Sequence, residues 1–530
     1  MVLDFISGAY KGRSVAIDSQ ECVNLYPEIS ESGNAKGKIS LIGTPGKRLF
    51  VDFGYGTIRA IYSTSDDRCF VVTGNRLYEM FSDRNTAYIG KLKTSSGNVG
   101  ISENETQLIL VDGIAGYLYY LNDGVEPAGT FNEILSGDYQ KGTSVVNVNR
   151  YFLQNVNDSG YFICSAIGDG NTWDALDAAS AEISPDKIAT VGTVNNELWV
   201  FGTKTVEVWY NSGNVDFPFS RINNASMNIG ISAKDSLGII NNSAIWIGGN
   251  SQGQGIVWMA TGYIPRRIST HGIEYLIGTF GDVSSAKAWV YQQEGHYFYV
   301  ISFPGAKRTL CYDISTDLWH ERGYYNKNTG LNEADIAGCA TFFAGNNYVG
   351  DYRNGKVYKL DLDYYYDDEN LIKRIRTGGH IHKDRKRIFF NQFEIDLERG
   401  IGLSTGPEEV TTTAPKIPVD CTLKIYTVTN YTAAQKVQIL SAIETYFSSN
   451  NGETITAEGW VGAVTAAMGS DFTTQLVYVI QSIDGTIRSY GLDTGEFPLY
   501  TYTSYIPDFS FESGKKGVFD VLNSSVTHYS

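Results

Sequence analysis

His380 and His382 are the two residues of this sequence whose spacing most directly suggests chemistry. On a strand, residues two positions apart project from the same face, so both imidazoles could approach one metal ion. The sequence offers no evident third ligand, and three basic residues, Lys383, Arg385 and Arg387, follow at once. We therefore favour a solvated strand face and predict no metal site.

A cluster of carboxylates precedes this pair and is acidic enough to hold Ca²⁺. It lacks the sharp-turn glycine and the fixed ligand spacing of a calcium loop. We therefore predict a solvated acidic face rather than an ion site. The candidate acidic surface consists of Asp361, Asp363, Asp367, Asp368 and Glu369.

A run of basic residues follows the acidic cluster, and it has two functional interpretations and one structural alternative. It could contact DNA phosphates or dock on an acidic partner surface. The structural alternative is a charged hairpin edge that discourages strand-to-strand aggregation. In so acidic a protein we favour partner docking, and DNA contact least. The candidate docking residues are Lys373, Arg374, Arg376, Lys383, Arg385, Lys386 and Arg387.

Catalytic signatures are not apparent in the sequence. It contains no phosphate-binding loop of the G-x-x-x-x-G-K-[ST] type, and its six histidines give no Ser-His-Asp order. The run Asp169-Gly-Asn-Thr-Trp173 resembles the Asp-box turn of sialidase-type propellers, which is structural. We predict that the chain is not an enzyme and needs no cofactor. The alternative is a glycan-binding or glycan-cleaving propeller, whose paired carboxylates would converge from different blades.

Composition and charge narrow the function further. Lys and Arg number 42 against 58 Asp and Glu, and the net charge of −16 repels phosphate backbones and anionic lipid. We expect no tight DNA binding, no signal peptide and no membrane span. The six cysteines lie far apart with no C-x-x-C pair, which favours buried free thiols in a reducing compartment over a disulfide framework.

The elements that would position these residues are mainly β-strands. From about residue 56 to 365 the chain repeats one unit, in which two alternating apolar runs flank a turn of Gly, Asn or Asp. A period of roughly 40 to 50 residues is typical of a β-propeller, here with six or seven blades. The alternative is a long β-sandwich, which rarely repeats one unit so often.

The flanking regions lack the blade pattern. We expect residues 1–55 to form an extended N-terminal arm or a cap, and residues 366–420 to form a connecting β-hairpin region. Residues 421–530 would form a C-terminal tip region of α+β and β structure. Its helices are predicted at 432–447, behind a Thr432–Gln435 capping box, and at 456–468.

Several stretches resemble the packaged-DNA stabilisation proteins of short-tailed phages, the tail accessory factors that form the tail nozzle. The clearest are SQECVNLYPE at 19–28 and VWYNSGNVDFPF at 208–219, and the shared order of all the stretches extends over about residues 1–405. Residues 421–480 depart from the family, which we expect to return directly to β structure. The other similar stretches are residues 43–46, 169–176, 185–186, 197–202, 267–274, 318–322 and 386–398.

The resemblance implies a structural protein of the virion tail, assembled in the host cytoplasm. Six copies would form a ring under the head-to-tail connector, extend the portal channel, retain packaged DNA and let it pass at ejection. The propeller would face outward as a platform for a tail fibre or spike. An acidic channel wall suits this role, because it would repel the phosphates of double-stranded DNA and let it slide without specific binding.

Overall fold

The structure is a computed structural model that divides the chain into two compact units, Met1–Thr413 and Ala414–Ser530. In the second unit it describes the backbone of short strands only. In the first unit it describes residues 5–14, 18–31, 39–122, 126–181, 186–250 and 253–380.

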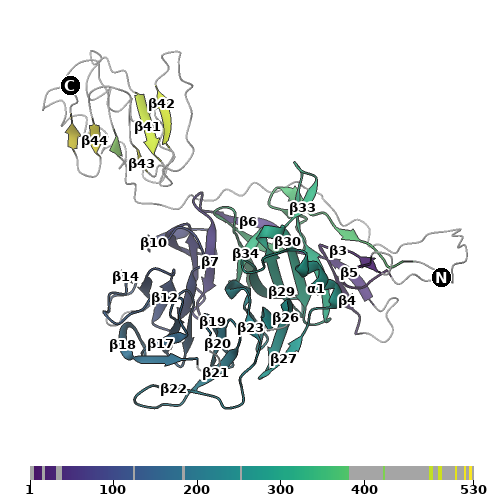
Figure 1. Cartoon of the computed structure of the whole chain (residues 1–530). Helices are drawn as coiled ribbons and strands as arrows, with labels where there is room; N and C mark the ends of the chain where they lie inside the picture. Colours follow the sequence, from purple (N-terminus) through teal and green to yellow (C-terminus); the bar gives the residue numbers. More distant parts are fainter. Residues whose placement is uncertain are drawn as a thin grey trace, which may run out of the picture. The chain divides into compact units, whose positions relative to one another are not determined.

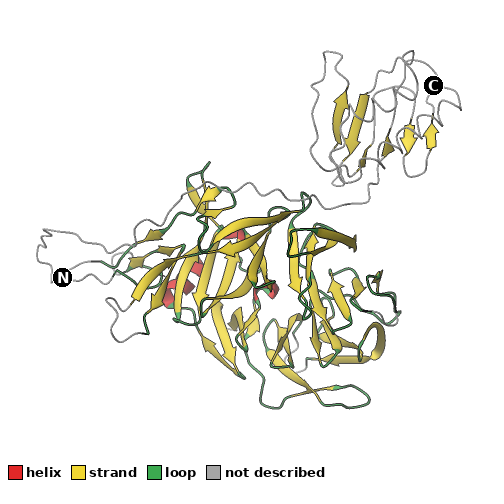
Figure 2. Ribbon diagram, turned by 180° about the vertical axis from the view of Figure 1, so that it is seen from behind, coloured by secondary structure: helices red, strands yellow, loops and turns green. Residues whose placement is uncertain are grey.

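Seven antiparallel sheets follow one another along the first unit and form a seven-bladed propeller (Figure 1). The inner strand of each blade contacts the inner strand of the next, and the last contacts the first, so the ring is closed. The prediction of a propeller is confirmed, the blade number is seven, and the sandwich alternative is wrong. Nearly all of the regular secondary structure of the described chain is strand, joined by loops and turns, as Figure 2 shows.

The first four blades are continuous in sequence, and each has four strands. Blade 1 contains β7 (Ile58–Ser63), β8 (Cys69–Thr73), β9 (Arg76–Met80) and β10 (Thr86–Lys91). Blade 2 contains β11 (Gly100–Glu103), β12 (Gln107–Val111), β13 (Gly116–Tyr120) and β14 (Phe131–Glu133). Blade 3 contains β15 (Val145–Val148), β16 (Tyr151–Asn155), β17 (Tyr161–Ala166) and β18 (Asp169–Ser180). Blade 4 contains β19 (Ile188–Val194), β20 (Glu197–Gly202), β21 (Val206–Asn211) and β22 (Phe219–Arg221).

Blades 5 and 6 follow in order, whereas blade 7 borrows its outer strand from the start of the chain. Blade 5 contains β23 (Gly230–Ile231), β24 (Gly238–Ile240), β25 (Ser243–Asn250), β26 (Gly253–Thr261) and β27 (Ile264–Arg267). Blade 6 contains β28 (Lys287–Gln293), β29 (His296–Phe303), β30 (Arg308–Asp313) and β31 (Leu318–Arg322). Blade 7 contains β34 (Ala337–Phe343), β35 (Asn346–Asp351), β36 (Lys356–Asp361) and β6 (Gly46–Asp52).

The inner hairpins of blades 3 to 7 turn on two consecutive residues with positive φ. This backbone matches the twist of the flanking strands and favours Asn, Asp and Gly, which explains the turn signals of the repeat. The five pairs are Asn149–Arg150, Asn195–Asn196, Asn241–Asn242, Glu294–Gly295 and Ala344–Gly345.

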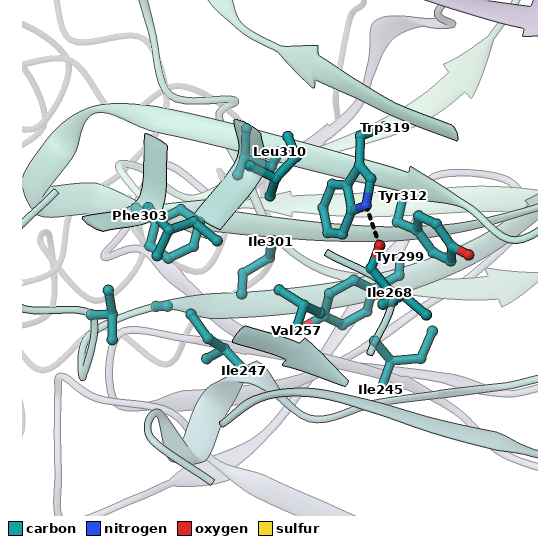
Figure 3. Close-up of a cluster of buried hydrophobic side chains, with 14 of the residues drawn as sticks. Ile245, Ile247, Val257, Ile268, Tyr299, Ile301, Phe303, Leu310, Tyr312 and Trp319 are labelled. Carbon is teal, nitrogen blue, oxygen red and sulfur yellow. Dashed lines mark hydrogen bonds between the residues drawn. The ribbon is translucent and has the colours of Figure 1, made fainter. Parts of the chain in front are cut away.

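Apolar side chains fill the spaces between neighbouring blades. One cluster joins blades 5 and 6, where Ile247 and Val257 face Ile301 and Trp319 (Figure 3). The indole Nε1 of Trp319 donates a hydrogen bond of 2.9 Å to the carbonyl oxygen of Ile268, so the ring is buried without losing its polar contact. Six further clusters fill the other spaces between blades.

The segments that flank the propeller add strands to blades 6 and 7. In blade 6, β3 of the arm pairs with β31 and then with β39, which follows the propeller. In blade 7, β37 pairs in parallel with β6, and β38 pairs with β37. Their bounds are β3 (Cys22–Val23), β37 (Tyr366–Asp367), β38 (Asn370–Leu371) and β39 (Ile375–Arg376).

Short elements complete the first unit. Two arm hairpins, one hairpin after blade 6, one α-helix and two 3₁₀ turns are present among the described residues. The hairpins are β1 (Tyr10–Lys11) with β2 (Ser19–Gln20), β4 (Leu25–Ile29) with β5 (Ile39–Gly43), and β32 (Tyr324–Asn326) with β33 (Leu331–Glu333). The helix is α1 (His271–Gly278), and the 3₁₀ turns are η1 (Lys234–Ser236) and η2 (Pro304–Ala306).

The second unit contains two small three-stranded sheets. The two helices predicted in this region lie outside the described residues, so they stay predictions. One sheet contains β40 (Thr422–Leu423), β44 (Val518–Asp520) and β45 (Ser525–Thr527). The other contains β41 (Val477–Gln481), β42 (Ile487–Gly491) and β43 (Asp508–Phe509).

The five cysteines of the described first unit are free thiols, as predicted. Four are buried and one is partly buried. Burial raises the pKa of the Cys22 thiol to about 11, so this group stays protonated and unreactive at neutral pH. The other four are Cys69, Cys164, Cys311 and Cys339, and Cys421 lies outside the described residues.

Candidate functional site: the seam that closes the propeller

The seam is the place where the arm, blades 6 and 7 and the segment leaving the propeller meet, and a buried lysine lies at its centre. The Nζ atom of Lys47, on β6, lies 2.9 Å from Oδ2 of Asp335 and 2.9 Å from Oδ1 of Asp367. All three side chains are buried. Such a triad is stable only while all its members are present, because an isolated buried charge is costly.

Two carboxylates share one ammonium group in this triad, and the pKa values reflect that. Burial alone would lower the pKa of Lys47, but attraction to Asp335 and Asp367 outweighs it and raises the pKa. Burial raises the pKa of Asp367, and the attraction of Lys47 offsets only part of this effect.

Gly46 allows the outgoing chain to cross close to β6. A Cβ atom at this position would lie 2.0 Å from the carbonyl oxygen of Tyr364, which is a backbone atom that cannot swing aside. The glycine therefore lets Asp367 come directly opposite Lys47 in the parallel pair of β37 and β6.

Asn24 fastens the arm to two other parts of the chain. Its backbone has a positive φ of 54° and its side chain is buried. Nδ2 donates hydrogen bonds to the carbonyl oxygens of Gly323, at 2.8 Å, and Lys373, at 2.9 Å. Oδ1 accepts a 2.9 Å hydrogen bond from the backbone N–H of Gly323. One side chain thus joins the arm, the end of blade 6 and the outgoing segment.

Arg376 fixes the arm from the other side. Its guanidinium reaches five oxygen acceptors, all on the arm, which is the kind of multiple contact that the planar fork of arginine permits. The acceptors are the carbonyl oxygens of Phe5, Gly8 and Glu21, the hydroxyl of Ser7 and Oε1 of Gln20.

The other described members of the predicted docking set also contact their own chain. Arg374 donates to the carbonyl oxygen of Thr44 at 3.4 Å and lies over the ring of Tyr365. Burial lowers its pKa. The Nζ atom of Lys373 lies 4.9 Å from the ring centre of Tyr325. Lys383, Arg385, Lys386, Arg387 and His382 lie outside the described residues, so the docking role stays a prediction.

The predicted acidic surface differs from a uniformly solvated face. Asp361 is 3.2 Å from Arg48, and Asp368 is 2.9 Å from Lys356. Asp367 is only 3% exposed, so its assignment to the surface is wrong. The reason is that β6 and β36 bring cations to this segment from elsewhere in the chain. Asp363 and Glu369 are exposed.

A buried polar network in blade 6 has the residue types of a catalytic site but makes structural contacts. Nδ1 of His296 lies 2.8 Å from Oδ2 of Asp313, and the same oxygen accepts a 2.8 Å hydrogen bond from Thr316 in the following turn. Burial, then repulsion by Arg322, holds the pKa of His320 well below its usual value. Neutral His320 can therefore accept the hydrogen bond from Arg322 Nε.

The Asp-box-like turn of blade 3 has the geometry predicted for a structural turn. Oδ1 of Asp169 accepts the backbone N–H of Asn171 at 2.9 Å, and Oδ2 accepts the Thr172 hydroxyl at 2.7 Å. The indole of Trp173 is buried and donates to the carbonyl oxygen of Gly170 at 2.7 Å. Across the described part of the chain, no three His, Cys, Asp or Glu side chains are grouped to hold a metal ion. No described helix is long and apolar enough to cross a membrane.

Little in the sequence indicates the seam. Lys47 and Asp335 were not among the predicted site residues, and Asn24 appeared only within the stretch at 19–28. The signal that could have identified the triad is weak: Lys47 and Arg48 stand directly before the apolar run at 49–51, and a lysine is seldom buried without a partner.

The fold and the seam define a class of protein: a seven-bladed propeller closed by its own N-terminal strand and clasped by the chain that leaves it. A family model described as "Phage_stabilise: Bacteriophage P22 Gp10, beta-propeller" matches residues 1–365. The chain belongs to this family of phage tail accessory and DNA-stabilisation proteins, which confirms the resemblance found in the sequence.

Comparison with other proteins adds only general propeller likenesses. None of the curated proteins matches the sequence. The WD40 propeller domain of Doa1 is 12% identical, with a TM-score of 0.38 over 60% of this chain and 97% of that one. The designed Ika8 protein is 11% identical, with a TM-score of 0.37 over 59% and 99%. An extracellular domain of BT4673 from B. thetaiotaomicron is 8% identical, with a TM-score of 0.40 over 59% and 40%. No argument rests on these likenesses.

Proposed function

We propose that this chain is a structural subunit of a short phage tail nozzle. Six copies form a ring below the head-to-tail connector, extend the portal channel, retain the packaged genome and let it pass at ejection. The observation that carries the proposal is the family match, which extends over both the arm and the propeller.

The seam supports a structural role in which the subunit must resist the pressure of packaged DNA. Propeller blades pack through apolar clusters on both sides, and the last blade is tied to the first by β6, whose Phe50 and Val51 belong to the cluster between blades 7 and 1. The contacts of the seam therefore join the arm, the propeller and the outgoing segment to one another. A subunit that must hold against DNA pressure benefits from having its described arm fastened to the propeller.

The charge of the chain supports passage of DNA without binding. A formal net charge of −16 gives an average surface that repels phosphates, so DNA slides rather than adheres. In this role the chain works without a cofactor or a catalytic site.

Partners follow from position in the virion tail. One end of the ring binds the connector, the outward propeller carries a fibre or spike, and assembly takes place in the host cytoplasm. Of the basic residues predicted for docking, those at 383–387 are the candidates for the contact with an acidic partner, since Arg374 and Arg376 are engaged by their own arm.

Imaging of purified protein with its connector tests the proposal. Negative-stain particles should show sixfold rings seated on the connector. Stable monomers that never join a connector would contradict the nozzle role.

A charge-reversal variant tests the docking segment. Changing Lys383, Arg385, Lys386 and Arg387 to Glu should reduce partner binding at least tenfold while the propeller stays folded. Equal binding by this variant and its matched control would exclude the segment as a docking site. The control reverses four exposed lysines of the blades, Lys91, Lys141, Lys187 and Lys204.

A further inference from the structure

The Lys47 triad has a geometry that an ordinary surface ion pair lacks. The amine nitrogen touches carboxylate oxygens of Asp335 and Asp367 at 2.9 Å each, and the three side chains are 6%, 3% and 5% exposed. The contacted oxygen belongs to the carboxyl group of Asp367, so the contact also places the amine nitrogen beside the carboxyl carbon. This burial limits the access of water, which would compete for both groups.

Backbone pairing fixes the two reacting groups. Asp367 lies directly opposite Lys47 in the parallel pair of β37 and β6, and the Asp368 N–H donates to the carbonyl oxygen of Lys47. Asp335 comes from a third segment, before blade 7, and its Oδ1 accepts a 2.8 Å hydrogen bond from the Ala337 N–H. Its other oxygen, Oδ2, faces Lys47.

From this arrangement we infer that Lys47 and Asp367 form a spontaneous intramolecular isopeptide bond, with Asp335 as the proton relay. The bond would be a covalent modification that ties the N-terminal strand of the propeller to the segment that follows its last blade. The inference does not depend on the nozzle role.

The reaction is a condensation without any redox change. Asp335 takes a proton from the ammonium group of Lys47, and the neutral amine attacks the carboxyl carbon of Asp367. The new bond joins Nζ to Cγ, the bond from Cγ to one carboxyl oxygen breaks, and that oxygen leaves as water. Asp335 passes its proton to the leaving oxygen, and the lysine nitrogen gives up a second proton to the same oxygen. Asp335 therefore ends as the carboxylate it was at the start.

Attraction to the two carboxylates raises the pKa of Lys47, so transfer of its proton to Asp335 is the uphill step of the reaction. The other surroundings favour this division of roles. Burial disfavours the charged form of the Asp367 carboxyl and so raises its pKa, which makes this carboxyl easier to attack than an exposed carboxylate. Arg322 is a buried cation whose field reaches both carboxyls, and it would stabilise negative charge on the oxygen of the tetrahedral intermediate. Of the two carboxylates, Asp335 is the one held in place by a backbone N–H, which suits it to the role of proton relay.

The neighbouring pair of Lys356 and Asp368 provides an internal control. The Nζ atom of Lys356, on β36, lies 2.9 Å from Oδ2 of Asp368, the residue after β37. These two side chains are 22% and 17% exposed. Its contacts include no second buried carboxylate like Asp335. We expect this pair to remain an ordinary ion pair.

Mass spectrometry of the full chain tests the inference. The denatured protein should weigh one water molecule less than its sequence, and a protease digest should contain a branched peptide that joins Lys47 to Asp367. An intact mass equal to the sequence mass, both after purification and after prolonged incubation of the folded protein, would overturn it. A branch from Lys47 to Asp335 would overturn the assignment of roles.

Three variants separate the bond from the ion pair. Lys47→Arg keeps the charge but cannot condense, so its full mass should be retained. Asp335→Asn keeps the shape but removes the relay, so the water loss should disappear while the circular dichroism spectrum stays that of the parent. Lys356→Arg should lose water as the parent chain does. Water loss that persists in Asp335→Asn would refute the relay.

Discussion

Blades 1 to 5 and blades 6 and 7 end differently at their outer edges. Within the described residues, the sheets of blades 1 to 5 end at β10, β14, β18, β22 and β27, strands local in sequence. The sheets of blades 6 and 7 continue into strands from the arm and from the outgoing segment. Local pairing thus builds the blades, whereas contacts between distant segments close the ring and fasten the arm.

The largest effect is expected from Lys47→Met, which removes the link of Lys47 to Asp335 and Asp367, as an ion triad or as a covalent bond, and leaves two carboxylates buried without a cation. It should lower the free energy of unfolding by about 3–5 kcal/mol. Urea denaturation followed by tryptophan fluorescence measures this. Lys187→Met removes an exposed pair with Asp158 in the region of local blades and should cost at most ~1 kcal/mol. Equal losses in both variants would erase the distinction between the two regions.

Arg376→Ala should loosen the arm without unfolding the blades. All five of its hydrogen-bond acceptors lie on the arm, so we expect the local stability of the arm to fall by roughly 1.5–3 kcal/mol. Hydrogen exchange should quicken at residues 5–23 and stay unchanged in blades 1 to 4. Quicker exchange throughout the propeller would show that arm and blades unfold together.

His320 makes blade 6 sensitive to acid. Its pKa is lowered in the folded protein, so the unfolded chain binds a proton more readily, and stability falls as the pH drops below the ordinary histidine value. The loss should approach about 1.4 kcal/mol per pH unit below pH ~6.5. Comparing denaturation at neutral and mildly acidic pH for the parent and for His320→Gln isolates the contribution of His320 to the pH dependence of stability. An identical slope in the variant would assign the acid sensitivity to other groups.

The smallest effect is expected at α1, which contacts β1 of the arm. The Thr270 hydroxyl caps the helix by accepting the N–H of Ile273. Thr270→Ala should therefore cost about 1 kcal/mol. Thermal unfolding measures the shift, and Thr270→Ser, which keeps the hydroxyl, is the control that should remain near the parent.

The blades were predictable because their partners are near in sequence. Residues 197–210 alternate as two strands, and Asn195–Asn196 supplies the positive φ values of the preceding tight turn. The repeat, the free thiols and the family could all be inferred from such local signals. The choice between six and seven blades could not, because β6 joins blade 7 from the far end of the chain.

The seam was not predictable for the same reason. Lys47 and Asp367 are 320 residues apart, and nothing in either neighbourhood announces the other. Without that contact, the acids at 361–369 looked like a solvated face and Arg376 looked available to a partner. Charge runs show where charges are, whereas their counterions are set by tertiary structure.

The origin of β6 also fixes the order in which the molecule can be finished. This strand leaves the ribosome before the other propeller strands, whereas its partner β36 is made last of them. At about 5–20 residues per second, the delay is on the order of tens of seconds. During that time Phe50, Val51 and Phe53 lack the neighbours that later bury them. Nascent chains are thus most vulnerable to aggregation just before the seventh blade emerges, and a chaperone that shields residues 46–53 would raise the yield of closed rings.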